Sequence, residues 1–226
     1  MALILLIETT TTNCSVALAR DGVVVACREQ DEEQYIHAEK LHLFIEELLN
    51  TCNTRKQQLQ AVCVSKGPGS YTGLRIGVSA AKGLCFALDI PLIAADTLFA
   101  LALYGKQLHP EFECYCAMTD ARRDDVYTST FDNAMKTMRE VSASTIDTMF
   151  IADMAGNNTL FIGNGAHKMS GRINESSSIE RLLPSAQMLG QIAEAKFQSN
   201  QFEDVAYFEP FYLKEFVAIA AKKKMF

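Results

Sequence analysis

Apolar residues at the start of the chain gather in short runs that only a few polar positions separate. Three such runs cover residues 3–7, 15–19 and 23–27, and Asp21-Gly22 lies between the second and the third. An Asp-Gly pair between two apolar runs is a strong hairpin signal, because both residues accept the left-handed backbone of a tight turn. We therefore predict that the chain opens with three strands in a meander.

After the meander, longer amphipathic segments alternate with further apolar runs. Large apolar residues recur at helical spacing between positions 41 and 49, which predicts a helix over residues 33–50. Apolar runs at 61–65 and 91–95 are each followed by a helical pattern, over residues 72–88 and 97–104. The order β-β-β-α-β-α-β-α predicts an α/β lobe in which a meander continues into parallel strands through helical crossovers.

A weaker copy of the opening pattern occupies the second half of the chain. Two apolar runs flank the polar sequence TDARRDD, which predicts another hairpin. The further elements that we predict are strands at 113–118, 126–131, 135–141 and 160–163, helices at 145–152 and 185–198, and a loop at 171–178. We expect a first lobe at residues 1–105 and a second, reduced lobe at residues 106–226, with the C-terminal segment packing back on the first.

Composition argues against several classes of protein. The chain has 226 residues, of which 49% are hydrophobic, and a net charge of -6, so it has no broad basic surface that would grip nucleic acid unaided. Seven scattered cysteines without a CxxC pair fit a reducing compartment. No window has the length of a membrane span, and the N-terminal run lacks the basic lead of a signal peptide. We expect a soluble, cytoplasmic protein without a membrane partner.

The sequence GPGSYTGLRIG, residues 67–77, joins a predicted strand to a predicted helix. It is no P-loop, because the lysine of that motif is missing. At 100° per residue, one helix face carries only Gly73, Gly77, Ala80, Leu84 and Ala87. Small residues at this spacing let another element approach closely, either inside the lobe or from another protein. Spacing alone favours packing inside the lobe, whereas a partner interface would leave a Gly77→Leu variant folded but weaken its complex.

Two kinds of chemistry compete with a pure binding role. His37 and His42 are five residues apart, so they do not share a helix face, and we predict no metal site. Thr9 and Thr10 at the first hairpin, with Gly163 and Gly165 in the second half, are candidates to hold a phosphate, with Asp120 as a second carboxylate. No base-plus-metal set emerges, so a nucleotide-binding ATPase or small-molecule kinase remains the alternative function.

Three segments together resemble the bacterial TsaB family, which is also called YeaZ. They are LLIETTTTNCSVAL near the start, SKGPGSYTGLRIGVSAAKGL in the middle and TDARRDDVY at the second hairpin. The resemblance implies an α/β fold of the actin-like, RNase-H-like kind, with a mixed sheet and helices in each of two lobes. It also implies a non-catalytic subunit that is required to form N6-threonylcarbamoyladenosine on the tRNA adenosine beside the anticodon. Peptidase activity is not expected.

The family implies partners and an interface as well. TsaB pairs with the catalytic subunit TsaD, the small ATPase TsaE assists, and tRNA is reached through the complex. The pairing uses the two helices of the first lobe, and the same helices can join two copies in a homodimer. The interface residues that this implies here are His37, Leu41, Gly73, Arg75, Gly77, Ala80, Lys82, Leu84 and Phe86.

The resemblance also bears on cofactors. No cofactor is expected to bind strongly to this chain alone, and ATP or ADP with Mg²⁺ is expected only in the complex. The family's opening usually reads Ile-Asp-Thr, whereas this chain has Ile7-Glu8-Thr9. The extra methylene of glutamate would displace a metal or its water, which argues against an inherited ATPase site without affecting a scaffold role.

Overall fold

The first half of the chain folds into a lobe around a five-stranded sheet. The computed structural model describes residues 2–32, 36–154 and 158–213. The elements of this lobe are β1 (Leu3–Glu8), β2 (Asn13–Arg20), β3 (Val23–Asp31), α1 (His37–Thr51), β4 (Ala61–Ser65), α2 (Tyr71–Leu88) and β5 (Leu92–Ala95). The sheet order is β3-β2-β1-β4-β5, with β1, β2 and β3 antiparallel and β1, β4 and β5 parallel. The predicted meander and parallel strands are confirmed.

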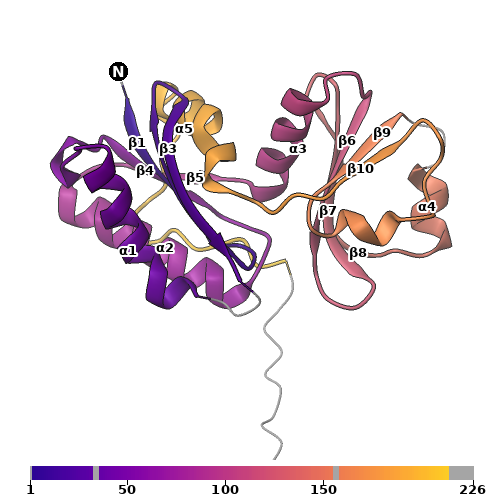
Figure 1. The fold of residues 1–226 in the computed structure, drawn as a ribbon, viewed down its shortest axis with the longest axis horizontal. Helices are drawn as coiled ribbons and strands as arrows, with labels where there is room; N and C mark the ends of the chain where they lie inside the picture. The colour runs from indigo at the N-terminus through magenta and orange to yellow at the C-terminus, as the bar shows by residue number, and fades with distance from the viewer. Residues whose placement is uncertain (1, 33–35, 155–157, 214–226) are drawn as a thin grey trace, which may run out of the picture.

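The second half repeats this plan around a second sheet (Figure 1). Its elements are β6 (Cys114–Asp120), β7 (Asp125–Asp132), β8 (Thr137–Thr145), α4 (Thr148–Met154), β9 (Thr159–Ile162) and β10 (Ser178–Glu180). The order β10-β9-β6-β7-β8 again joins an antiparallel meander to parallel strands. The predicted α/β class, with a mixed sheet and helices in each lobe, is therefore confirmed.

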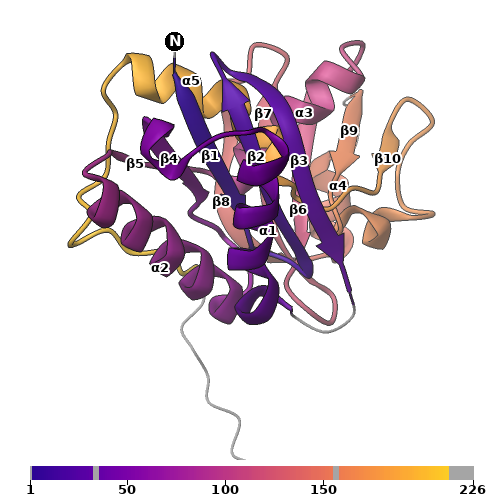
Figure 2. The ribbon, with the colours of Figure 1, turned by 60° about the vertical axis from the view of Figure 1, so that its left-hand side comes forward.

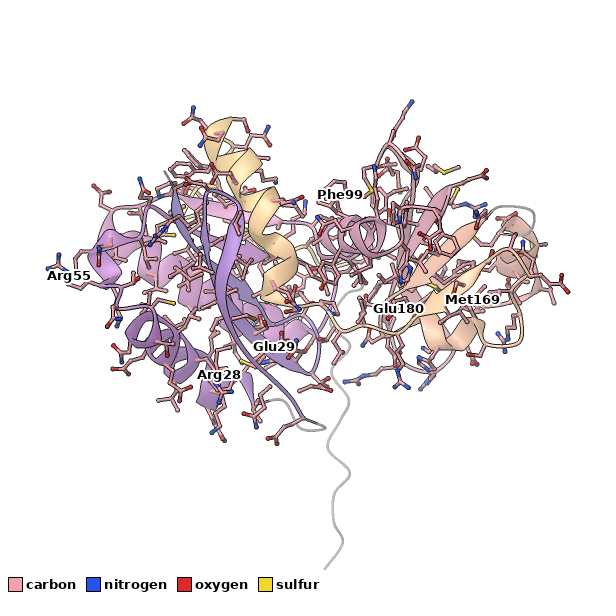
Figure 3. All side chains as sticks on the ribbon, turned by 45° about the horizontal axis from the view of Figure 1, so that its top comes forward. Arg28, Glu29, Arg55, Phe99, Met169 and Glu180 are labelled. Atoms are coloured by element: carbon pink, nitrogen blue, oxygen red, sulfur yellow. The ribbon has the colours of Figure 1, made fainter. Side chains whose placement is uncertain are left out.

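Helices cover both faces of the first sheet. Figure 2 shows α1 and α2 side by side on one face, where their apolar residues pack on β2 and β4. On the other face lies α5 (Gly190–Gln198), which contacts β1 and β5. Between the lobes lies α3 (Thr97–Leu108) (Figure 1). Phe99 of α3 points toward the second lobe (Figure 3), where its ring centroid lies 5.4 Å from that of Phe131.

Several predicted bounds need correction. The helix predicted over 97–104 runs to Leu108, and Gly105 within it packs against Ile162 of the second sheet. Residue 105, where the first lobe was expected to end, lies within this helix, which packs on β6, β7 and β9. The helix predicted from 145 begins at Thr148, since β8 continues to Thr145. The predicted start of the first helix, residues 33–35, lies outside the described residues, as do residues 214–226 of the second lobe.

The return from the second lobe to the first is held by polar side chains of the first sheet. Ser185 donates a hydrogen bond to Glu29 Oε2, and Ala186 N donates to Ser15 Oγ at 3.0 Å. Figure 3 shows Glu29 on β3. The helix predicted over 185–198 is therefore broken into a 3₁₀ turn, Ala186–Leu189, and α5. No helix in the described part of the chain combines the length and apolar character that crossing a membrane requires.

Candidate partner-binding face and interlobe cleft

The glycine-rich segment places the start of α2 against the turn between β1 and β2. Ser70 caps the helix by accepting a hydrogen bond from Gly73 N. Thr10 O accepts from Ser70 N at 2.7 Å, and Thr9 Oγ1 donates to Gly73 O at 2.8 Å. The residues of GPGSYTG thus hold the start of α2 against the β1–β2 turn.

The small-residue face of α2 packs inside the lobe at Gly73 and Gly77. A Cβ atom on Gly73 would lie 2.1 Å from Thr9 O, and one on Gly77 would lie 2.2 Å from Thr9 Oγ1. Both distances are far below van der Waals contact, so these glycines let the β1–β2 turn approach the helix backbone. A Gly77→Leu variant is accordingly expected to disturb the fold of the lobe itself.

Three more residues of the predicted interface are buried within the chain. His37 is 1% exposed, Leu41 0% and Ala80 7%. The His37 Nε2–H donates to Thr11 O at 2.7 Å, and burial lowers the pKa of the imidazole, so the ring is a neutral structural group. In the free chain these side chains therefore support the two helices from below.

The outward face of α2 carries the exposed members of the predicted set. Phe86 is 85% exposed, and Arg75 is exposed on the same face. Leu84 is half-buried at the edge of the core. Spacing also places Gly83 on this outward face, and a Cβ atom there would meet nothing within 4 Å. On α1 the side chain of Leu43 is 50% exposed. This outward face of α1 and α2, centred on Phe86 and Leu43, is called the helix face below.

A strap formed by residues 202–213 runs along α2, on the lobe to which the C-terminal segment was expected to return. Glu203 N donates to Leu92 O, and Phe211 N donates to Lys66 O, each at 2.8 Å. Lys82 Nζ donates to Ala206 O at 3.1 Å and to Phe208 O at 3.0 Å. Lys82, predicted as an interface residue, therefore holds the strap in place. Tyr207, which lies on the strap between Ala206 and Phe208, is 84% exposed.

The strap ends at a cleft between the two lobes. The cleft has a volume of ≈ 660 Å³, which lies in the range of small-molecule sites. It is lined by the β1–β2 turn, the start of α2, the β6–β7 hairpin, Asn164 and the end of the strap. Of the four residues predicted to hold a phosphate, Thr10 lines this cleft. Thr9 faces α2, and Gly163 and Gly165 are buried against the end of β6.

Glu8 lies beneath the cleft and is 1% exposed. Its Oε1 accepts from Thr10 N at 2.6 Å, and its Oε2 accepts from the Ser65 hydroxyl. Burial raises the pKa of this carboxyl, and the hydrogen bonds from Ser65 and Thr10 offset that rise only in part. Within the described ranges, no three His, Cys, Asp or Glu side chains gather as metal ligands do. Glu8 is therefore a buried group whose two carboxylate oxygens are hydrogen-bonded within the first lobe.

The variant Glu8→Gln is expected to raise stability at neutral pH and to leave stability in acid nearly unchanged. The amide keeps a hydrogen bond to Thr10 N and to Ser65. Because the folded-state pKa of Glu8 lies above its ordinary value of 4.5, wild-type stability falls as the pH rises from 4.5 through the folded-state pKa. Urea unfolding of both proteins from about pH 4 to about pH 8 measures the difference. A constant difference at every pH would contradict this reading of Glu8.

The chain is similar in sequence to known proteins over most of its length. Over residues 32–221 it matches the family model TsaD: tRNA N6-adenosine threonylcarbamoyltransferase. The tRNA threonylcarbamoyladenosine biosynthesis protein TsaB of Escherichia coli is 30% identical over 224 residues, which cover 95% of this chain and 96% of that protein. The chain belongs to the TsaB family. The Bacillus subtilis TsaB is 38% identical over 138 residues, which cover 57% of this chain and 54% of that protein.

A solved structure confirms the fold. The crystal structure of a Pseudomonas aeruginosa protein, described as similar to peptidase YEAZ, superposes with a TM-score of 0.80 at 25% identity. The superposition covers 95% of this chain and all of that one. The predicted actin-like arrangement of two lobes, and the resemblance to the TsaB family on which it was based, are both confirmed.

Proposed function

We propose that this protein is an accessory, non-catalytic subunit in the formation of N6-threonylcarbamoyladenosine on the tRNA adenosine beside the anticodon. The observation that carries the proposal is the alignment with the Escherichia coli biosynthesis protein TsaB, which covers 95% of this chain and 96% of that one. In this role the chain binds the transferase TsaD and supports the reaction that TsaD performs. TsaE, ATP and Mg²⁺ act on the assembled complex.

The chemistry of the cleft supports an accessory role. Glu8 beneath the cleft and Asp120 in its lining are both held by neighbouring groups. Glu8 is sealed below the surface, and Asp120 Oδ1 accepts from Lys168 Nζ at 2.7 Å and from Arg122 N at 2.7 Å. A catalytic acid–base group must reach its substrate in the correct protonation state. We therefore place the chemistry on TsaD.

The helix face supports the pairing with TsaD. Phe86 is a large apolar side chain that extends into solvent, and aromatic side chains in such positions dominate the binding energy of many interfaces. The family model that matches this chain is that of the transferase itself, so the two proteins have related sequences. Related lobes can meet through equivalent helices around an approximate twofold axis. A second copy of this chain is the competing occupant of the same face.

Co-purification tests the pairing. Tagged wild-type chain and untagged TsaD are mixed and separated by size-exclusion chromatography, each alone and together. We expect a stable 1:1 complex that forms at the expense of any homodimer of this chain. Separate elution of the two proteins at concentrations well above those in the cell would contradict the proposed pairing, whatever the oligomeric state of the free chain.

A further inference from the structure

The interlobe cleft has two charged side chains, those of Asp120 and Arg122, among the described residues that line it. The Asp120 carboxylate is neutralised by Lys168, whose Nζ lies 2.7 Å away. The guanidinium of Arg122 is exposed. The rest of the lining includes Thr10–Thr12, Ser70, Thr72 and several aromatic residues, together with the apolar Pro68, Ala121 and Leu213.

The backbone holds Arg122 in an unusual conformation. Arg122 has φ of 71° and Arg123 has φ of 50°, so both residues at the tip of the β6–β7 hairpin lie in the left-handed region. Side chains other than glycine, asparagine and aspartate rarely adopt this region, and such strain gathers at binding and catalytic sites. Asp120 stabilises the turn by accepting a hydrogen bond from Arg122 N. The turn therefore fixes which of the two arginines borders the cleft.

The opposite side of the cleft is an aromatic platform. The rings of Tyr71 and Tyr212 lie with their centroids 5.0 Å apart, and the guanidinium of Arg75 lies 4.6 Å from the centroid of Tyr71. Tyr212 is brought there by the strap and is 37% exposed, and its neighbour Phe211 is 40% exposed. Tyrosine rings backed by arginine are the usual stacking surface for an unpaired base. Both Tyr71 and Tyr212 line the same cleft as Arg122.

We infer that the cleft binds one unpaired nucleotide of the RNA substrate, with its base on the Tyr71–Tyr212 platform and its phosphodiester at Arg122. The choice of RNA rests on the proposed function. The cleft volume of ≈ 660 Å³ accommodates one nucleotide. A phosphodiester carries one negative charge, which one arginine balances. A Mg²⁺–triphosphate needs carboxylates that are free to face it. Among the described residues that line the cleft, the one carboxylate is that of Asp120, which is paired with Lys168.

Matched variants test this inference in the reconstituted modification reaction, with unmodified tRNA as the varied substrate. Tyr212→Ala removes half of the platform, and Arg122→Ala removes the cation. Their controls are Tyr207→Ala, on the same strap but outside the cleft, and Arg123→Ala, in the same hairpin with the same left-handed backbone. We expect the KM for tRNA to rise about tenfold for Tyr212→Ala, since stacking contributes about 1–3 kcal/mol per base. The value of kcat and both controls should stay near wild type.

A salt titration of tRNA binding to the complex isolates the phosphate contact. Loss of one phosphate contact lowers the slope of log K against log salt by about 0.7. We expect this decrease for Arg122→Ala and none for Arg123→Ala. Equal KM values and salt slopes in cleft variants and controls would overturn the inference, as would a change confined to the KM for ATP. The same reactions also show whether modification of the tRNA depends on the presence of the wild-type protein. Failure of the inference is therefore distinguishable from failure of the proposed function.

Discussion

Replacing Gly73 with alanine is expected to destabilise the protein by about 3 kcal/mol, the upper part of the range for overpacking a close contact. The added methyl group would lie 2.1 Å from the carbonyl oxygen of Thr9, which belongs to the backbone and cannot rotate away. Relief requires that α2 separate from the β1–β2 turn. That movement would also break the hydrogen bond from Thr9 Oγ1 to Gly73 O. Urea denaturation followed by circular dichroism measures the loss.

Gly83→Ala is the matched control, because it makes the same substitution in the same helix. A Cβ atom at Gly83 meets nothing within 4 Å, so only the helix propensity changes. This variant is expected to gain about 0.5–1 kcal/mol of stability. Equal stability of the Gly73 and Gly83 variants would show that the small-residue face is not packed inside the lobe, and would reopen its role as a contact surface for TsaD.

Phe86→Asp is expected to weaken binding to TsaD by roughly 30-fold or more, the effect of losing an aromatic hot spot of at least about 2 kcal/mol. The side chain is 85% exposed, so the substitution leaves the core and the fold intact. In the complex the introduced carboxylate would be buried against an apolar partner surface, which adds a desolvation cost. Isothermal titration calorimetry with purified TsaD measures the affinity.

Met149→Asp provides the control for Phe86→Asp. Met149 is 76% exposed on α4 of the second lobe, so this change also places a charge at an exposed apolar position, but away from the helix face. We expect the Met149 variant to bind TsaD like the wild type. If both variants bind normally, TsaD does not use this part of α2, and the strap side of the first lobe becomes the next surface to test.

The first lobe could be predicted from sequence because its signals are local. Each strand is a short apolar run, and each helix has one apolar face, so residues 3–95 reveal their elements without knowledge of the tertiary contacts. The three-residue strand β10 was not predicted, because so short a segment carries no periodicity; the loop predicted at 171–178 overlaps it only at Ser178. The strap at 202–213 lacks periodicity as well, since it is held by backbone contacts to Leu92 and Lys66.

The candidate site could be predicted only in part. Spacing showed that Gly73 and Gly77 share a bare face, but the residue that fills the gap, Thr9, is 64 positions away from Gly73 in the chain. The burial of His37 depends on the same turn, through its bond to Thr11 O. Phe86 was found because an aromatic residue among polar neighbours is visible in the sequence. The left-handed Arg122 and the Tyr71–Tyr212 pair are products of tertiary structure.

Reconstitution of the modification tests the central claim most directly. Unmodified tRNA, threonine, bicarbonate, ATP, the adenylate-forming enzyme, TsaD and TsaE are combined with and without this protein, and threonylcarbamoyladenosine is quantified by mass spectrometry. The proposed function predicts modification only when this protein is present, and none when it replaces TsaD. Equal modification with and without it, by components shown to be active, would contradict its role as a required subunit.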